Sequence, residues 1–185
     1  MNVKVKKGCN IRLTGSSERI VVDLPVDRVA YTLADFPYLK PKMLLKEGDK
    51  VECGTPLFCE KKTPEVVFVS PVAGVVEEIV RGDRRVLLEV IIKKEGEGKV
   101  SFPKLAMADV EKLEVESAKK ALLDRGLWAF LKRRPFHKVA LVTDTPANIF
   151  VTCLDSNPLA ADPNFYLDGR EDDFNAGIAL LSRIC

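Results

Sequence analysis

The sequence has few of the residues from which metal centres and nucleophilic active sites are built. It has one histidine, His137, so a histidine-based triad or metal site has almost nothing to work with. Its five cysteines include no Cys-x-x-Cys pair, which argues against zinc ribbons, thioredoxin-like motifs and ferredoxin-type clusters. We interpret them as free, mostly buried thiols: Cys9, Cys53, Cys59, Cys153 and Cys185.

Signals for nucleotide and membrane binding are missing as well. No Gly-x-x-x-x-Gly-Lys-Ser/Thr loop occurs, and the one Gly-x-Gly, residues 96–98, lies in an acidic turn without a third glycine. A P-loop and a dinucleotide fingerprint are therefore rejected. The longest apolar run, residues 66–76, is interrupted by serine, proline and glycine and is shorter than a membrane span. No apolar stretch follows the basic N-terminal residues, so we expect no secretory signal and a cytoplasmic chain.

What is present is an ordinary globular composition. The 185 residues are 46% hydrophobic and 30% charged, which suffices for one sizeable domain or two small ones. With 29 basic and 27 acidic side chains the net charge is +2, so the composition gives no general attraction to nucleic acid. We expect no nucleic-acid partner.

Residues 1–104 predict a β-rich domain. Short apolar runs alternate with glycine, proline and charged turns, and the clearest strands cover residues 66–69, 75–80 and 86–93. The tripeptide Arg81-Gly82-Asp83 between the last two is interpreted as a hairpin turn.

Residues 105–135 predict a helical linker. Asp109 can cap a helix over 110–124 whose apolar contact is made by Ala118, Ala121 and Leu122. Gly126 suits the position after its last turn, and a second short helix is expected over 127–132.

Residues 136–185 predict the beginning of an α/β domain. Strands are expected over 138–142 and 149–154, and a helix over 172–184. Because a helix that follows a strand normally leads back to another strand, we expect this to be the N-terminal piece of a longer polypeptide.

Residues 47–58 (EGDKVECGTPLF) and 70–76 (SPVAGVV) carry matching turn glycines and apolar positions. In this they resemble the biotinyl/lipoyl carrier domain, which implies a barrel-sandwich hybrid over about residues 40–95. Counted from Glu60, which stands at the usual glutamate of that family, the cofactor-bearing lysine falls on Thr63, while Lys61 and Lys62 stand two and one places early. The resemblance therefore implies a projecting hairpin used as a scaffold, and we expect no covalent cofactor.

One loop and two side chains are candidates for contact with a ligand or partner. Two prolines stiffen the loop after the second expected α/β strand, where ligands of α/β sheets usually bind. A structural loop is nevertheless favoured over a ligand site. The lone tryptophan is either a core residue or a wedge between domains. Arg133 and Arg134 before Pro135 pair with a carboxylate or a partner or, as we favour, are a solvated helix end. The candidate residues are Asp155, Asn157, Asp162, Trp128 and Arg134.

Several unusual strings occur together along the chain. They are GLW at 126–128 with RPF at 134–136, IFV at 149–151 and DSNPLAADP at 155–163, and KKG at 6–8 precedes them. With Gly15, they resemble the A-subunit family of the sodium-translocating NADH:quinone oxidoreductase, the Nqr complex of respiratory electron transport. The fold that follows is α+β: a barrel-sandwich hybrid, a helical linker, and the start of a Rossmann-like α/β domain.

This resemblance implies a peripheral subunit on the cytoplasmic side of the bacterial inner membrane, without a transmembrane segment of its own. Its partners would be the other Nqr subunits, integral membrane subunits included, and it would contribute to assembly and to the quinone-reducing end of a sodium-transporting enzyme. Flavins and iron–sulfur centres are expected in the partners, with no cofactor in this chain and no catalysis by it alone. Contact with ubiquinone stays open. The alternatives are a carrier-like scaffold domain without covalent cofactor and an Rnf-type electron-transport subunit.

Overall fold

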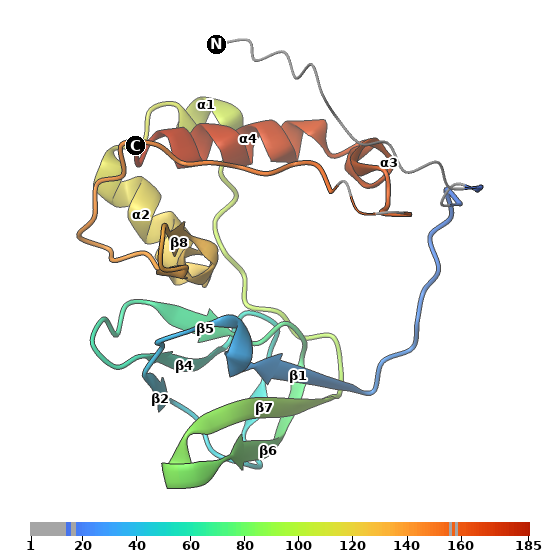
Figure 1. The fold of residues 1–185 in the computed structure, drawn as a ribbon, viewed down its shortest axis with the longest axis vertical. Coiled ribbons are helices and arrows are strands. Elements are labelled where there is room, and N and C mark those ends of the chain that lie inside the picture. Colours follow the sequence, from blue (N-terminus) through green and yellow to red (C-terminus); the bar gives the residue numbers. More distant parts are fainter. Residues whose placement is uncertain (1–13, 16–17, 156, 158) are drawn as a thin grey trace.

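The structure, a computed structural model, describes residues 14–15, 18–155, 157 and 159–185. It has a β part and a helical part (Figure 1). The strands that follow the extended segment before Arg28 form the β part. The helices that follow residue 106 lie at the opposite end of the molecule, with the chain crossing between the two parts near residue 100 (Figure 1).

The β part consists of two antiparallel sheets that fold over one core. The larger sheet has the order β1-β7-β6-β3, with β1 Arg28–Thr32, β7 Leu87–Lys94, β6 Gly74–Arg81 and β3 Lys50–Val51. The smaller has the order β2-β4-β5, with β2 Pro41–Met43, β4 Pro56–Glu60 and β5 Val67–Val69. Two one-turn 3-10 segments lie in the connections, η1 Leu33–Asp35 and η2 Asp83–Arg85.

Aromatic rings fill the middle of this barrel. Phe58 and Phe68 are fully buried and stack with their centroids 4.6 Å apart. Tyr31 meets both rings edge-on, and Phe36 packs edge-on against Phe68 at 4.9 Å. Such geometries are the favoured ones for aromatic pairs. The rings come from four separate segments, so this cluster ties both sheets together.

One glycine is required by the packing of the larger sheet. A Cβ atom on Gly74 would lie 1.9 Å from the carbonyl oxygen of Lys93, a distance no side chain can occupy. Gly74 therefore allows β6 to begin directly against β7.

Among the residues that the structure describes, the helical part contains four helices, a 3-10 turn and a two-stranded hairpin. Their bounds are α1 Met107–Val110, α2 Val115–Asp124, η3 Trp128–Phe130, β8 Lys132–Arg133, β9 Lys138–Val139, α3 Pro163–Leu167 and α4 Glu171–Ser182. Helix α4 packs against α1 (Figure 1), and Ile184 after it is almost completely buried. The 3-10 turn η3 lies against α2, β9 and strand β5 of the barrel.

The three strands expected most clearly in the barrel are present, and so is the expected last helix. Strands β5, β6 and β7 and helix α4 lie within one or two residues of their predicted ranges. The single helix expected over 110–124 is wrong, because two helices occur and Asp109 lies inside the first. Ala118 and Leu122 do form the buried stripe of α2. The helix expected over 127–132 is only the turn η3, after which the chain extends into β8.

The prediction of two α/β strands, over residues 138–142 and 149–154, is the larger error. Of residues 138–142 only Lys138 and Val139 form a strand, paired with β8. Residues 149–154 form no strand among the described residues, and the side chain of Phe150 is 90% exposed. An apolar run becomes a strand only where another strand completes its ladder. Within the described residues that partner is absent.

The cysteines are also more exposed than expected. Of the four that the structure describes, all are free, only Cys59 is buried, and Cys53, Cys153 and Cys185 are exposed. Cys9, Lys6 to Gly8 and two residues of the 155–163 loop lie outside the described residues. Within the described part, no helix is both long and apolar enough to span a bilayer.

Candidate functional site

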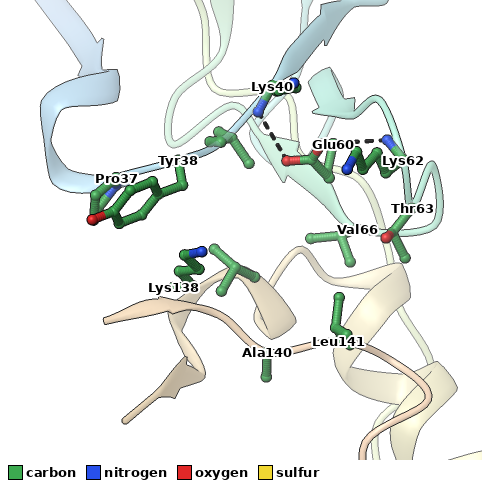
Figure 2. Close-up of a pocket in the computed structure, with 12 residues that line it drawn as sticks. Pro37, Tyr38, Lys40, Glu60, Lys62, Thr63, Val66, Lys138, Ala140 and Leu141 are labelled. Atoms are coloured by element: carbon green, nitrogen blue, oxygen red, sulfur yellow. Dashed lines mark hydrogen bonds between the residues drawn. The ribbon is translucent and has the colours of Figure 1, made fainter. Parts of the chain in front are cut away.

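A cavity lies between the barrel and the helical part, at the tip of the β4–β5 hairpin (Figure 2). Its volume is about 190 Å³. The barrel side is formed by residues 37–40 and the hairpin, and the facing side by the chain at 138–141. The cavity therefore stands where the carrier resemblance puts the cofactor-bearing tip. The lining residues that bear on its chemistry are Tyr38, Lys40, Glu60, Lys62, Thr63 and Lys138.

Glu60 holds the hairpin tip in a fixed turn. One carboxylate oxygen accepts a hydrogen bond from the backbone N–H of Lys40 at 2.9 Å, and the other accepts one from the N–H of Lys62 at 3.2 Å (Figure 2). The N–H of Thr63 donates to the Glu60 carbonyl, and Val66 donates to that of Thr63. Thr63 is half-buried in the cavity wall, so the tip does not project freely as expected.

The rim opposite the hairpin is cationic and aromatic. The Lys138 ammonium lies 4.3 Å from the centroid of the Tyr38 ring and 5.6 Å from that of Phe136. Tyr38 and His137 both have positive φ angles, 68° and 54°. Such angles are uncommon outside glycine and are often found where a loop is held for a purpose. This arrangement can hold a partner side chain or a small anion, and it has no paired acid and base for catalysis.

Trp128 joins the two parts of the molecule. Its side chain is 2% exposed, and its indole N–H donates to the carbonyl oxygen of Ala140 at 2.9 Å. It belongs to the same buried cluster as Phe58 and Phe68 of the barrel. The two interpretations of the tryptophan therefore merge, because it is a core residue of a core that continues across the junction.

The residues around this junction extend the aromatic cluster. Phe130 packs against Phe36 with centroids 6.3 Å apart, and the Lys132 ammonium lies 3.8 Å from the centre of the Phe36 ring. Burial lowers the pKa of Lys132, an effect opposed by the nearby Asp35 carboxylate. Burial also raises the pKa of Tyr31 to about 12, with the Asp35 charge acting in the same direction. Both shifts follow from the partial burial of these two side chains.

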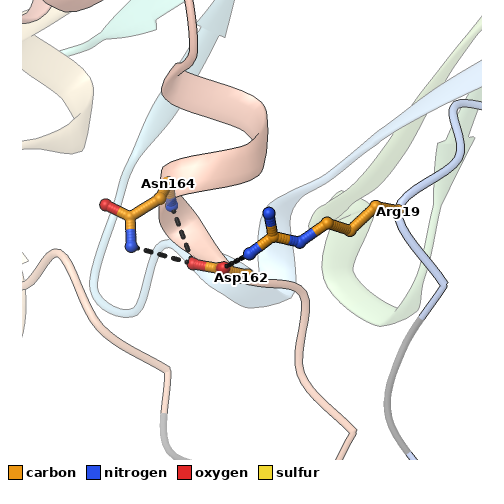
Figure 3. A network of polar contacts seen from close by, with 3 residues as sticks. All are labelled: Arg19, Asp162 and Asn164. Atoms are coloured by element: carbon orange, nitrogen blue, oxygen red, sulfur yellow. Dashed lines mark hydrogen bonds and ion pairs between the residues drawn. The ribbon is translucent and has the colours of Figure 1, made fainter.

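Hydrogen bonds and one ion pair hold the described residues of the predicted acidic loop. Asp155 accepts a hydrogen bond from the N–H of Asn157 at 2.9 Å, and both residues are exposed. Asp162 caps helix α3 by accepting from the N–H of Asn164 at 3.0 Å, and it pairs with Arg19 at 2.6 Å (Figure 3). The Asn164 backbone bond is the main reason why the pKa of Asp162 is lowered. Within the described residues these contacts give the loop a structural role, and its ligand role stays a prediction.

The five candidate residues are not brought together. Trp128 is buried at the junction, whereas Asp155, Asn157 and Arg134 are exposed. The solvated state that we favoured for Arg133 and Arg134 is wrong for Arg133, which pairs with Asp144 at 3.2 Å, whereas Arg134 has no ion pair in the part of the chain that the structure describes. The described residues also contain no cluster of three metal-ligating side chains.

Sequence reasoning missed the cavity. Glu60 was recognisable as the glutamate of the carrier pattern, and this was the one signal available. Nothing in the sequence around Tyr38 or Lys138 indicates that these residues meet, since they are a hundred residues apart. Such a contact is set by the tertiary fold and has no local pattern.

Comparison with known proteins agrees with this architecture. The profile of the NqrA N-terminal barrel-sandwich hybrid domain matches residues 3–95, and that of the NqrA second alpha/beta domain matches residues 113–185. The expected fold class is thereby confirmed, although the strands of the α/β region differ from those predicted.

Curated relatives match almost the whole chain. Over 183 residues it is 40% identical to a protein of Neisseria meningitidis serogroup A, 39% identical to one of Pasteurella multocida and 38% identical to one of Actinobacillus pleuropneumoniae. Each is named as the A-subunit of a Na(+)-translocating NADH-quinone reductase. The match covers 98% of this chain and 41% of each relative, so the chain spans about two fifths of their length. The chain belongs to the NqrA family, the A-subunits of the Na(+)-translocating NADH-quinone reductase.

Proposed function

We propose that this chain acts as part of a peripheral subunit of a sodium-translocating NADH-quinone reductase, on the cytoplasmic side of the membrane. The observation that carries the proposal is the 40% identity to a named NqrA protein across 98% of the chain. In this role the chain contributes binding surfaces for other subunits, integral membrane subunits included. It takes part in the oxidoreductase activity only through the assembled complex.

The distribution of apolar side chains supports a contact-forming role. Among the described residues between positions 141 and 159, Phe150, Leu154 and Leu159 are more than half exposed, and Leu141 and Val151 are nearly half exposed. Large exposed apolar patches are uncommon on monomers and are typical of interaction surfaces. We infer that this segment, which we call the apolar segment, is covered in the assembled complex.

The proposal assigns the redox chemistry to the partners. For the iron–sulfur centres, the cysteine spacing supports this assignment, because the sequence has no Cys-x-x-Cys run of the kind that ligates such clusters. We further propose that the chain contributes to assembly at the quinone-reducing end, which rests on the naming of its relatives as NADH-quinone reductase subunits. Binding of quinone by this chain itself stays open.

Affinity purification from the native membrane tests the proposal. The full-length subunit, tagged and expressed in its own host, is expected to retain the other subunits and NADH-driven quinone reduction. Replacing two exposed residues of the apolar segment, F150S with L154S, is expected to reduce the amount of retained subunits. A matched substitution on the barrel, L44S, removes an exposed leucine elsewhere and is expected to have little effect.

Two results would contradict the proposal. One is a wild-type subunit that purifies alone from conditions in which the other subunits are present. The other is stoichiometric flavin or iron in the isolated subunit together with NADH oxidation by it alone. Either would show that the chain works outside the complex or carries chemistry of its own.

A further inference from the structure

The β6–β7 hairpin ends in an unusual turn. We call residues 81–88, which follow one another as RGDRRVLL, the arginine tip. Arg84 and Arg85 have φ angles of 54° and 61°, and the N–H of Val86 donates to the carbonyl oxygen of Asp83 across them at 3.2 Å. Two successive positive φ angles are what the centre of a type I′ hairpin turn requires.

Arginine is a poor residue for these two positions. Type I′ turns favour Asn-Gly, because glycine and asparagine tolerate the left-handed region while a Cβ with a long side chain is disfavoured there. The neighbouring Gly82, which could adopt a positive φ at no cost, has φ −92° instead. The glycine of this turn thus stands at a position that does not need a positive φ angle, whereas the two arginines stand at positions that do. Strain of this kind is expected to persist where the side chains serve a purpose.

The charges of the arginine tip are not used within the fold. Arg81, Arg84 and Arg85 are exposed, and within the described residues none of them has an ion pair. The guanidinium of Arg81 instead donates to the carbonyl oxygen of Arg85 at 3.3 Å, which braces the turn. Asp83 is the one acidic residue of the tip, so the net charge of the tip is positive.

Two aliphatic side chains stand beside these charges. Val86 is 57% exposed and Leu88 45% exposed, and Leu88 lies over Gly82 so closely that a Cβ there would be 3.1 Å from it. The arginine tip therefore presents three cations around a small apolar surface on a braced turn. Arginines beside apolar contact are typical of the residues that dominate protein–protein interfaces.

The location of the arginine tip separates it from the cavity and the apolar segment. The hairpin end lies at the bottom of the view in Figure 1, on the side of the barrel away from helices α1, α2 and α4. Contacts made here would leave the junction around Trp128 free for other partners.

We propose that the arginine tip inserts into an acidic socket with an apolar floor on another subunit of the complex. This rests on the proposed function, since membership of a multi-subunit enzyme implies neighbouring subunits. A protein socket is favoured over a lipid surface, because membrane-binding segments usually carry about four to eight basic residues and the tip has three with one carboxylate. A shaped socket, in contrast, gains from a braced turn whose side chains need little further ordering.

The test replaces the two arginines at positive φ angles and measures both the stability of the subunit and its binding to partners. In the full-length subunit, R84N with R85G restores the preferred turn, and we expect its melting temperature to rise by about 2–4 °C. The same variant is expected to bind the remaining subunits at least about tenfold more weakly, as is the charge reversal R84E with R85E. The matched control is K42E with K46E, an equal charge change at two exposed lysines elsewhere on the barrel, and it is expected to bind normally.

The results separate the possible failures. If R84N with R85G binds like wild type, or if it melts at a lower temperature, the proposal is overturned while the proposed function stands. If the wild-type subunit retains no partner at all, the proposed function fails first. Vesicles containing phosphatidylglycerol provide the last comparison: binding by the wild-type subunit that R84E with R85E abolishes would show a lipid occupant and overturn the protein socket.

Discussion

The barrel buries its large aromatic and aliphatic side chains, whereas the C-terminal region leaves several of its large apolar side chains exposed. In the barrel, residues 28–94, Phe58, Phe68 and Val90 are completely buried. In residues 136–185, Phe150 is 90% and Leu154 69% exposed. The barrel is built from antiparallel strands whose partners lie within some tens of residues, so its core closes on itself. The C-terminal region also has apolar runs, but such a run buries its side chains as a strand only where a partner strand pairs with it.

Substitution of one glycine in each region is expected to give the largest difference in unfolding free energy between the barrel and the C-terminal region. Gly74→Ala is expected to lower the free energy of unfolding by about 3–5 kcal/mol or to prevent folding, because its Cβ would overlap the Lys93 carbonyl oxygen at 1.9 Å. Gly177→Ala in helix α4 meets nothing within 4 Å and is expected to raise helix stability by about 0.5–1 kcal/mol. Urea unfolding followed by circular dichroism measures both. Equal effects of the two substitutions would contradict the contrast.

Two phenylalanines give the next largest effect. Phe68→Ala removes a ring that contacts three others in the barrel, and it is expected to cost about 3–5 kcal/mol of unfolding free energy. Phe150→Ala removes a ring that is 90% exposed, and its effect is expected to stay within about 0.5 kcal/mol. The same urea titration applies. A cost above about 1 kcal/mol for Phe150→Ala would show that the C-terminal region buries this ring in solution.

The contrast also shows what the sequence could and could not predict. The strands β5, β6 and β7 follow from apolar runs bounded by turn residues, and each finds its partner nearby. The runs at 138–142 and 149–154 are also apolar, but they yield only the two-residue strand β9, because the remaining residues find no partner strand among the described residues. Local pattern thus predicts an element only where the partner is also local.

The candidate site repeats this lesson. The cap of helix α3 could have been recognised, since Asp162 followed by Pro163 is the preferred start of a helix. The cavity could not, because Tyr38 and Lys138 meet only through the packing of two distant segments. Trp128 was singled out as an unusual residue, but only the structure shows the single core that it shares with the barrel.

Proteolysis tests the contrast through local stability. Segments with few buried contacts open more readily, and proteases cut the open form. We expect trace amounts of a non-specific protease to cut first between residues 136 and 185 and to leave a resistant fragment that contains residues 35–100. Mass spectrometry of the fragments locates the cuts. Digestion of the barrel first, or equal protection of the last 50 residues, would show that the C-terminal region is as well packed as the barrel.

The smallest expected effect concerns the cap of helix α3. The backbone N–H of Asn164 and the Arg19 guanidinium both favour the charged form of Asp162, so its pKa in the folded chain lies below the ordinary value of 3.8. A carboxylate with a lowered folded pKa stabilises the fold above the unfolded pKa, and that stabilisation disappears as the pH falls through the folded pKa. Asp162→Ala is therefore expected to weaken the amide protection of residues 164–167 at pH 7 and to change little at pH 2.

Hydrogen exchange of those amides at the two pH values measures the effect. Asp168→Ala is the matched control, since it removes an exposed carboxylate from the other end of the same helix, where an anion does not cap free N–H groups. Raising the salt concentration should remove only the part contributed by the exposed Arg19 pair and leave the capping bond. If Asp162→Ala and Asp168→Ala behave alike at pH 7, the carboxylate does not cap the helix, and Asp162 becomes free for the ligand role that the loop's sequence suggested.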